Sequence, residues 1–259
     1  MKPSPKKKQL LGLQIGAGSL ELLIEKAVIS IRERNPPFKF ACANPHSLVT
    51  AQADGEFMQA LRACNAVVAD GVGVTLVARL TGVQVGPRIT GTDFFLGLMS
   101  KLNRRGGRAF FFGSSDSVLG SMLVRARREF PNIHIDILSP PYGSWSEADN
   151  DAMVEQIRAA KPDVLWVGMT APRQEKWIQQ NALRLDVPVM GSIGAVFDFY
   201  AGNTQRAPDW ICGIGLEWLY RLAREPRRLW RRTLLSAPRF LWLVARERVG
   251  FYSRDLNRN

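Results

Sequence analysis

The chain has 259 residues, 46% of them hydrophobic, so it can bury a large core and is not a disordered protein. Its three scattered cysteines form no CxxC pair, which argues against a disulfide framework or a zinc site. The net charge of +12 lies at the ends, because residues 1–8 carry +4 and residues 217–259 carry +7. Basic ends on a near-neutral body indicate an anionic partner, such as lipid headgroups, phosphates or nucleic acid.

The sequence predicts no export and no membrane span. The lysines of residues 1–8 lead to no long apolar core and no cleavage-like site, so this segment is a poor signal peptide. The longest stretch without a charged residue, Phe40 to Ala53, is 14 residues long and partly polar, which is too short to cross a bilayer. We therefore expect a cytoplasmic protein whose membrane contact is peripheral, on the inner face of the cell membrane.

In chain order, the first predicted element is a helix over residues 19–34, which ends at Asn35-Pro36-Pro37. Short apolar strands and helices then alternate. The predicted strands cover residues 40–43, 66–69, 108–112, 133–138, 164–168 and 187–191, and the helices between them cover residues 48–63, 72–81, 91–105, 117–130, 147–160 and a segment that starts at Pro172. This alternation predicts an α/β fold with a parallel, Rossmann-like sheet wrapped by helices.

Polar residues follow the predicted strands. Asp70 comes directly after residues 66–69 and is flanked by Gly71 and Gly73, while Asn44 follows residues 40–43. Ligands of open α/β sheets bind beyond the carboxyl ends of the strands, so Asp70 is a candidate to face a substrate. The alternative is that Asp70 caps the helix over residues 72–81. His46, also close to a strand end, is interpreted as a surface or capping residue without a chemical role.

Two further segments resemble ligand-binding motifs weakly. The turn Gly113-Ser114-Ser115-Asp116 joins a strand to a helix and could hold an anion, but it continues into neither GxGxxG nor a Walker A motif. Asp149-Asn150-Asp151 looks like the DxD motif that some sugar transferases use to hold a metal. Because acidic residues are favoured in the first turn of a helix, we interpret it as a helix start and predict no metal and no cofactor.

The character of the chain changes after Gly202. Residues 203–259 contain no lysine, many arginines and four of the seven tryptophans, and residues 234–245 are an apolar stretch flanked by arginines. This pattern is typical of helices that lie in a membrane interface. We therefore predict an α/β catalytic domain over residues 1–202 and a C-terminal appendage over residues 203–259 that docks on the membrane and completes the active site. The alternative is that the same apolar faces pack against the sheet domain.

A set of motifs, in the same order along the chain, resembles the WecG/TagA/CpsF family, glycosyltransferase family 26. The motifs are Asn44-Pro45, Ala69-Asp70-Gly71, Arg88-Ile89-Thr90-Gly91-Thr92-Asp93, Pro172-Arg173-Gln174-Glu175-Lys176-Trp177, Arg206-Ala207-Pro208 and Glu217-Trp218-Leu219-Tyr220-Arg221 through Pro226-Arg227-Arg228. The resemblance implies a metal-independent, inverting transferase that acts at the cytoplasmic membrane face. It would move an N-acetylmannosamine-type or glucose-type sugar from a UDP-sugar to an undecaprenyl-diphosphate-linked saccharide, in the synthesis of cell-surface polysaccharides.

The resemblance also implies roles for individual residues. Asp70 would be the catalytic base, and the substrate would be bound by Asn44, Gly71, Arg88, Gln174, Arg221, Arg228 and Arg231. These residue types suit the chemistry, since glycosyl transfer needs a base for the acceptor hydroxyl and cations for the departing diphosphate. Two departures from the family pattern, Cys42 and Gly168-Met169-Thr170, bear on which donor sugar fits.

Two other classes stay open from the sequence. A nucleotide-dependent oxidoreductase would use the same architecture, although the glycine fingerprint of such enzymes is absent. A nucleic-acid-binding protein would explain the basic tail but not Asp70. The preferred interpretation predicts a UDP-sugar donor, a lipid-diphosphate-linked acceptor and an anionic membrane surface as partners, with no nucleic acid, and it is compatible with a homo-oligomer.

Overall fold

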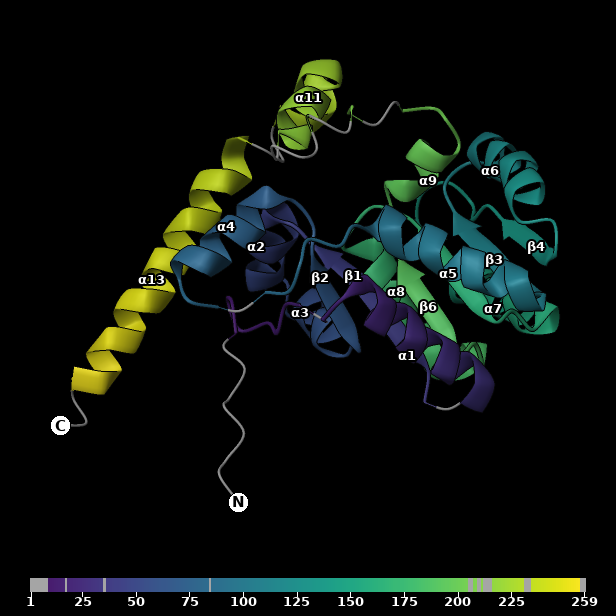
Figure 1. Cartoon of the computed structure of the whole chain (residues 1–259), viewed down its shortest axis with the longest axis horizontal. Helices are drawn as coiled ribbons and strands as arrows, with labels where there is room; N and C mark the ends of the chain where they lie inside the picture. Colours follow the sequence, from purple (N-terminus) through teal and green to yellow (C-terminus); the bar gives the residue numbers. More distant parts are fainter. Residues whose placement is uncertain are drawn as a thin grey trace.

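The computed structural model describes residues 9–16, 18–34, 36–83, 85–204, 207, 208, 211, 216–230 and 234–256, without the side chains of residues 228, 229 and 250–256. The described part contains one six-stranded sheet in the order β2-β1-β6-β5-β3-β4, in which all paired strands are parallel (Figure 1). The strands are β1 (Phe38–Ala43), β2 (Ala66–Ala69), β3 (Gly107–Gly113), β4 (Ile133–Leu138), β5 (Val164–Gly168) and β6 (Val189–Ser192). The prediction of a parallel α/β sheet is confirmed.

Helices cover both faces of this sheet (Figure 1). They are α1 (Leu20–Glu33), α2 (Pro45–Ala53), α3 (Gly55–Arg62), α4 (Val72–Leu80), α5 (Gly91–Arg105), α6 (Asp116–Glu129), α7 (Glu147–Ala160), α8 (Arg173–Leu185), α9 (Val196–Tyr200), α11 (Glu217–Arg224), α12 (Pro226–Trp230) and α13 (Ser236–Leu256). The single helix predicted between the first two strands is in fact two helices. Asp54 ends α2 and also caps the start of α3, because its side chain accepts a hydrogen bond from the backbone N–H of Phe57.

The core is divided by the alternation of side chains along the central strands. In β3, Phe111 lies in a cluster with Phe94 and Trp166 on one face of the sheet, while Phe110 and Phe112 pack with residues of α7 and α8 on the other face. All of these side chains are almost fully buried. A sheet buried on both faces leaves its strand ends as the places where polar groups meet solvent.

Close approach of two strand ends shapes the carboxyl edge of the sheet. Gly113, the last residue of β3, has φ +114°, and a Cβ atom at this position would lie 2.8 Å from the backbone of Gly168, the last residue of β5. A side chain would therefore be strained and would push the two strands apart. Glycine at position 113 keeps the ends of β3 and β5 together beneath the loops that follow them.

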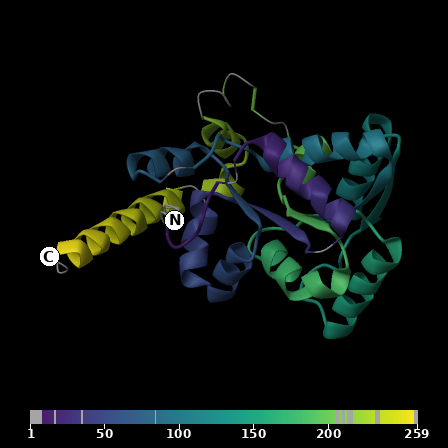
Figure 2. The ribbon, with the colours of Figure 1, turned by 60° about the horizontal axis from the view of Figure 1, so that its bottom comes forward.

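The C-terminal helix α13 packs along α2 and extends past the sheet domain (Figures 1 and 2). Phe240, Leu243 and Val244 of α13 are buried in one cluster with Leu48 of α2 and Val74 of α4. One face of α13 thus shows the packing against the sheet domain that the sequence leaves open as an alternative. In α11, by contrast, no side chain is buried.

None of the helices in the described residues is both long and apolar enough to span a bilayer.

Candidate functional site

A cavity of about 1390 Å³ lies at the carboxyl edge of the sheet. Every strand contributes to its lining through the residues that follow it, namely Asn44, Asp70, Ser114, Ser139, Met169 and Ile193. Its outer wall comes from the C-terminal helices, through Trp218, Arg221, Phe240 and Leu241. Ligand pockets commonly measure roughly 300 to 1,000 Å³, so this cavity has room for more than one substrate group.

Asp70 lies in the cavity wall at the end of β2. Its backbone N–H donates to the carbonyl of Ala43 (2.8 Å), which continues the pairing of β1 and β2 by one residue and fixes the backbone from which the carboxylate extends. Helix α4 begins at Val72 and its N-cap is Gly71, so the interpretation of Asp70 as the helix cap is wrong. Gly71 has φ +95°, a conformation that other residues rarely adopt, and this lets the chain turn directly after Asp70.

Asn44 combines a structural contact with a place in the cavity. Its side-chain Oδ1 accepts a hydrogen bond from the backbone N–H of Ser47 (3.0 Å), and its backbone N–H donates to Ser47 Oγ (2.7 Å). Asn44 therefore caps α2. These bonds orient the side chain and leave Nδ2, which has no acceptor among the described residues, as a donor for a ligand.

His46 also lines the cavity, although its place in the sequence predicts only a surface or capping residue. Its Nδ1 lies 2.8 Å from Oγ of Ser236, the first residue of α13. The histidine therefore connects α2 to the C-terminal helix at the edge of the site. The spacing of single residues in the sequence carries no signal for this contact, because the two residues are 190 positions apart.

Gln174 is held by hydrogen bonds at both ends of its amide. It lies in the first turn of α8, as predicted, although the helix begins at Arg173 rather than at Pro172. Its Oε1 accepts from the Gly194 amide (3.1 Å) and its Nε2 donates to Glu175 Oε1 (2.7 Å). With 6% of its surface exposed, the side chain is a rigid part of the cavity wall.

Glu175 is a candidate site residue that the sequence places only within the Pro172–Trp177 motif, without a role of its own. The residue is 3% exposed, and Oε2 has no hydrogen-bond partner in the described part of the chain. Burial raises the pKa of this carboxyl to about 7, although the hydrogen bond from Gln174 acts in the opposite direction. Helical spacing could have revealed it, because Glu175 lies three and seven residues before Ile178 and Ala182 on the buried face of α8.

We expect Glu175→Gln to stabilise the protein at high pH. A raised pKa means that the folded wild-type protein holds the Glu175 proton more tightly than the unfolded chain does. This contribution to the free energy of unfolding is fully present below the ordinary pKa of 4.5 and is lost as the pH rises through about 7. The shift corresponds to roughly 3 kcal/mol. Glutamine keeps the acceptor for Gln174 without the charge. Melting temperatures of both proteins should differ most at pH 8 and converge towards pH 5; a difference that is the same at both pH values would contradict a buried, titrating Glu175.

Two arginines line the cavity. Arg88 precedes α5 and its Nη2 lies 2.6 Å from Oε2 of Glu217, the first residue of α11. Arg221, one turn later in α11, places its guanidinium 5.0 Å from the centre of the Phe199 ring. Both arginines line the cavity, so α11 adds the cation of Arg221 to a site that is otherwise built on the sheet domain.

The structure brings together six of the eight predicted site residues, namely Asn44, Asp70, Gly71, Arg88, Gln174 and Arg221. Arg228 belongs to α12, but its side chain is not among those described. Arg231 lies outside the described residues.

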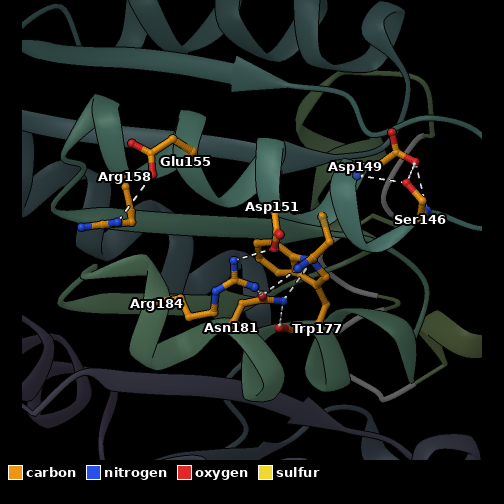
Figure 3. Close-up of polar contacts among 9 residues, drawn as sticks. Ser146, Asp149, Asp151, Glu155, Arg158, Trp177, Asn181 and Arg184 are labelled. Carbon is orange, nitrogen blue, oxygen red and sulfur yellow. Dashed lines mark hydrogen bonds and ion pairs between the residues drawn. The ribbon is translucent and has the colours of Figure 1, made fainter.

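The DxD-like segment is a helix start, as interpreted from the sequence (Figure 3). Asp149 Oδ2 accepts hydrogen bonds from the amide and hydroxyl of Ser146, and Asp151 forms an ion pair of 2.6 Å with Arg184 of α8 (Figure 3). The segment therefore caps α7 and holds it to α8. Within the described residues, no group of three or more His, Cys, Asp or Glu side chains could hold a metal ion.

The cavity, with a carboxylate and two guanidinium groups at the carboxyl ends of a parallel sheet, is where open α/β sheets bind their ligands. The model of the glycosyl transferase WecG/TagA/CpsF family matches residues 8–254, and the chain belongs to this family. It is therefore a glycosyltransferase.

Named relatives support this assignment. The chain is similar to the N-acetylglucosaminyldiphosphoundecaprenol N-acetyl-beta-D-mannosaminyltransferase of Bacillus subtilis (strain 168), with 33% identity over 79% of this chain and 77% of the relative. The protein of the same name from Bacillus spizizenii is 33% identical over 78% of this chain and 76% of its own length. The protein of this name from Staphylococcus aureus (strain MW2) is 25% identical over 79% of this chain and 78% of its own length.

Proposed function

We propose that this protein transfers a sugar from a UDP-sugar to the saccharide of an undecaprenyl-diphosphate-linked acceptor, with inversion at the anomeric carbon, in the synthesis of a cell-surface polysaccharide. The observation that supports this most is the position of Asp70, whose backbone is fixed at a strand end and which lines a cavity large enough for two substrates. The names of the relatives support an acceptor of this kind and a product with β configuration.

In the proposed reaction, Asp70 accepts the proton of the acceptor hydroxyl while that oxygen attacks the anomeric carbon of the donor. The bond from this carbon to the diphosphate breaks, and the negative charge that develops on the diphosphate is stabilised by Arg88 and Arg221. A donor with α configuration gives a β product in one displacement. Gln174 and Asn44, whose amides are held by hydrogen bonds, would orient the donor and acceptor groups.

The donor sugar is proposed to be of the N-acetylmannosamine type, on the strength of the relatives' names. Cys42, one of the departures from the family pattern, lines the cavity. Burial raises the pKa of its thiol well above the ordinary value, and the nearby carboxylates of Asp70, Glu175 and Asp93 raise it further. A neutral thiol at this position would offer the donor sugar a weak hydrogen-bonding group.

We further propose that residues 203–259 dock on the anionic inner face of the cell membrane. Large apolar side chains are exposed throughout this segment: Leu216, Trp218, Leu219, Trp230, Leu234, Leu235, Leu241, Trp242 and Val249. Arg246 stacks over the Trp242 ring, 4.9 Å from its centre, which places a cation beside an exposed aromatic group. Aromatic and apolar side chains with neighbouring arginines suit the headgroup region of a bilayer.

The direct test of the transfer reaction is turnover by the purified chain. UDP-N-acetylmannosamine, UDP-N-acetylglucosamine and UDP-glucose would each be incubated with a synthetic N-acetylglucosaminyl diphosphate lipid, and the product would be analysed by mass spectrometry and NMR. We expect a β-linked disaccharide from the first donor. Calorimetric titrations with NAD and duplex DNA serve as controls for the two alternative classes; binding of either, without transfer from any UDP-sugar, would refute the proposal.

We predict that turnover does not depend on a divalent metal, because the DxD-like acids are engaged in capping and in an ion pair. Activity should be the same with and without an excess of EDTA. Loss of activity in EDTA that is restored by Mg²⁺ or Mn²⁺ would show that this prediction is wrong.

A further inference from the structure

One side of the mouth of the cavity is apolar, where residues of α4, α11 and α13 line it. Leu76 of α4 and Leu241 of α13 both line the cavity and are nevertheless 54% and 56% exposed. Trp218 of α11 lines it as well and is about as exposed. Side chains that are half exposed and also line a cavity lie at its opening. We call these three residues the apolar rim.

The apolar surface continues from the rim along two helices. On α4, Val72, Leu76 and Leu80 are spaced by four residues, share one helical face and are all exposed. On α13, Leu241 and its neighbour Trp242 are both exposed, and so are Leu234 and Leu235, which directly precede this helix. Both helices lie at the end of the molecule where the C-terminus lies (Figures 1 and 2).

This surface is not simply the edge of the core. The inward sides of α4 and α13, through Val74, Val77 and Phe240, are buried together in one cluster. The helices are thus already fixed to the body of the protein by other residues, and the side chains of the rim are not needed to hold them. A helix in a monomeric protein normally has polar residues on its solvent side, so an apolar face that leads into a site indicates an apolar ligand group.

We propose that the apolar rim binds the first isoprenoid units of the lipid-linked acceptor. This inference rests on the proposed function, in which the saccharide end of the acceptor lies at Asp70. The isoprenoid chain would then leave the cavity across Leu76 and Leu241 and follow α4 towards Leu80. The enzyme would recognise the lipid itself, in addition to the sugar, and the chain would pass from the site into the bilayer on which the C-terminal helices dock.

The proposal can be tested by binding, without turnover. Calorimetry would compare farnesyl diphosphate, which has three isoprenoid units, with isopentenyl diphosphate, which has one, on the full-length protein. We expect the longer chain to bind the wild-type protein at least about tenfold more tightly, because more apolar surface is buried. Leu76→Ser and Leu241→Ser should each reduce the ratio of the two affinities, farnesyl diphosphate over isopentenyl diphosphate, several-fold. The matched control is Leu183→Ser, at a 95% exposed position of α8 outside the cavity, which should not change it.

The exposed positions of Leu76 and Leu241 make unfolding of the variants an unexpected result, and melting temperatures would verify this. Equal affinities of the two diphosphates for the wild-type protein, or an unchanged ratio in both variants, would overturn the proposal. So would variants that lose only liposome binding, or only self-association in sedimentation, because the rim would then be a bilayer or subunit contact. Chain-length preference in binding without any glycosyl transfer would instead refute the proposed function and leave the isoprenoid site standing.

Discussion

Replacing Asp70 by asparagine should lower turnover by about a hundredfold or more, the effect typical of losing a general base. The substitution keeps the size and shape of the side chain, and the backbone hydrogen bond that fixes position 70 does not involve the carboxylate. We therefore expect UDP binding and the melting temperature to stay close to those of the wild-type protein. Initial rates at saturating donor and acceptor would measure the loss.

The chain offers a matched control for this variant. Asp186 ends α8 at an exposed position outside the cavity and has φ +50°, a conformation that asparagine tolerates well. Asp186→Asn should therefore have wild-type activity. Near-full activity of Asp70→Asn at saturating substrate would show that another group takes the proton, and Glu175, with its raised pKa, would be the next candidate in the cavity wall.

The second large effect is expected at Arg221. A hydrogen bond to a charged group contributes about 1.5–3 kcal/mol, so Arg221→Ala should lower kcat/KM by roughly 10- to 150-fold if the guanidinium contacts the diphosphate. Arg221→Lys should recover only part of this loss, because lysine keeps the charge but not the two-pronged geometry. Calorimetry with UDP should show weaker binding by both variants.

Arg224, on the same helix, separates this effect from a general loss of positive charge. It is exposed, does not line the cavity and stacks over Tyr220 at 5.9 Å, in a contact similar to that of Arg221 with Phe199. Arg224→Ala removes the same charge from α11 and should affect donor binding little. Equal losses in the two alanine variants would indicate that the helix acts through its overall charge and not through Arg221.

The sheet could be predicted from the sequence because its strands are short apolar runs between amphipathic helices. Asp70, Asn44 and Gln174 could be proposed as well, since each follows a strand and lies in a recognisable motif. The contributions of His46 and Glu175 depend on tertiary structure. The contact of His46 with Ser236 joins residues 190 positions apart. Helical spacing indicates that Glu175 lies on the buried face of α8, but the raised pKa of its carboxyl depends on how completely the packed helix excludes water. Neither the path of α13 along α2 nor the Arg88–Glu217 ion pair follows from local sequence pattern.

The position of β6 has a consequence for how the chain is made. This last strand lies in the middle of the sheet, where Val189 is the register partner of both Phe38 in β1 and Val164 in β5. Until residues 189–192 have left the ribosome, β1 with β2 and β3 with β4 and β5 are two separate ribbons with open edges, which favour mispairing. Because Asp70 belongs to one ribbon and Gln174 follows the other, no shorter nascent chain can assemble the site, and synthesis itself delays activity until the sheet is closed.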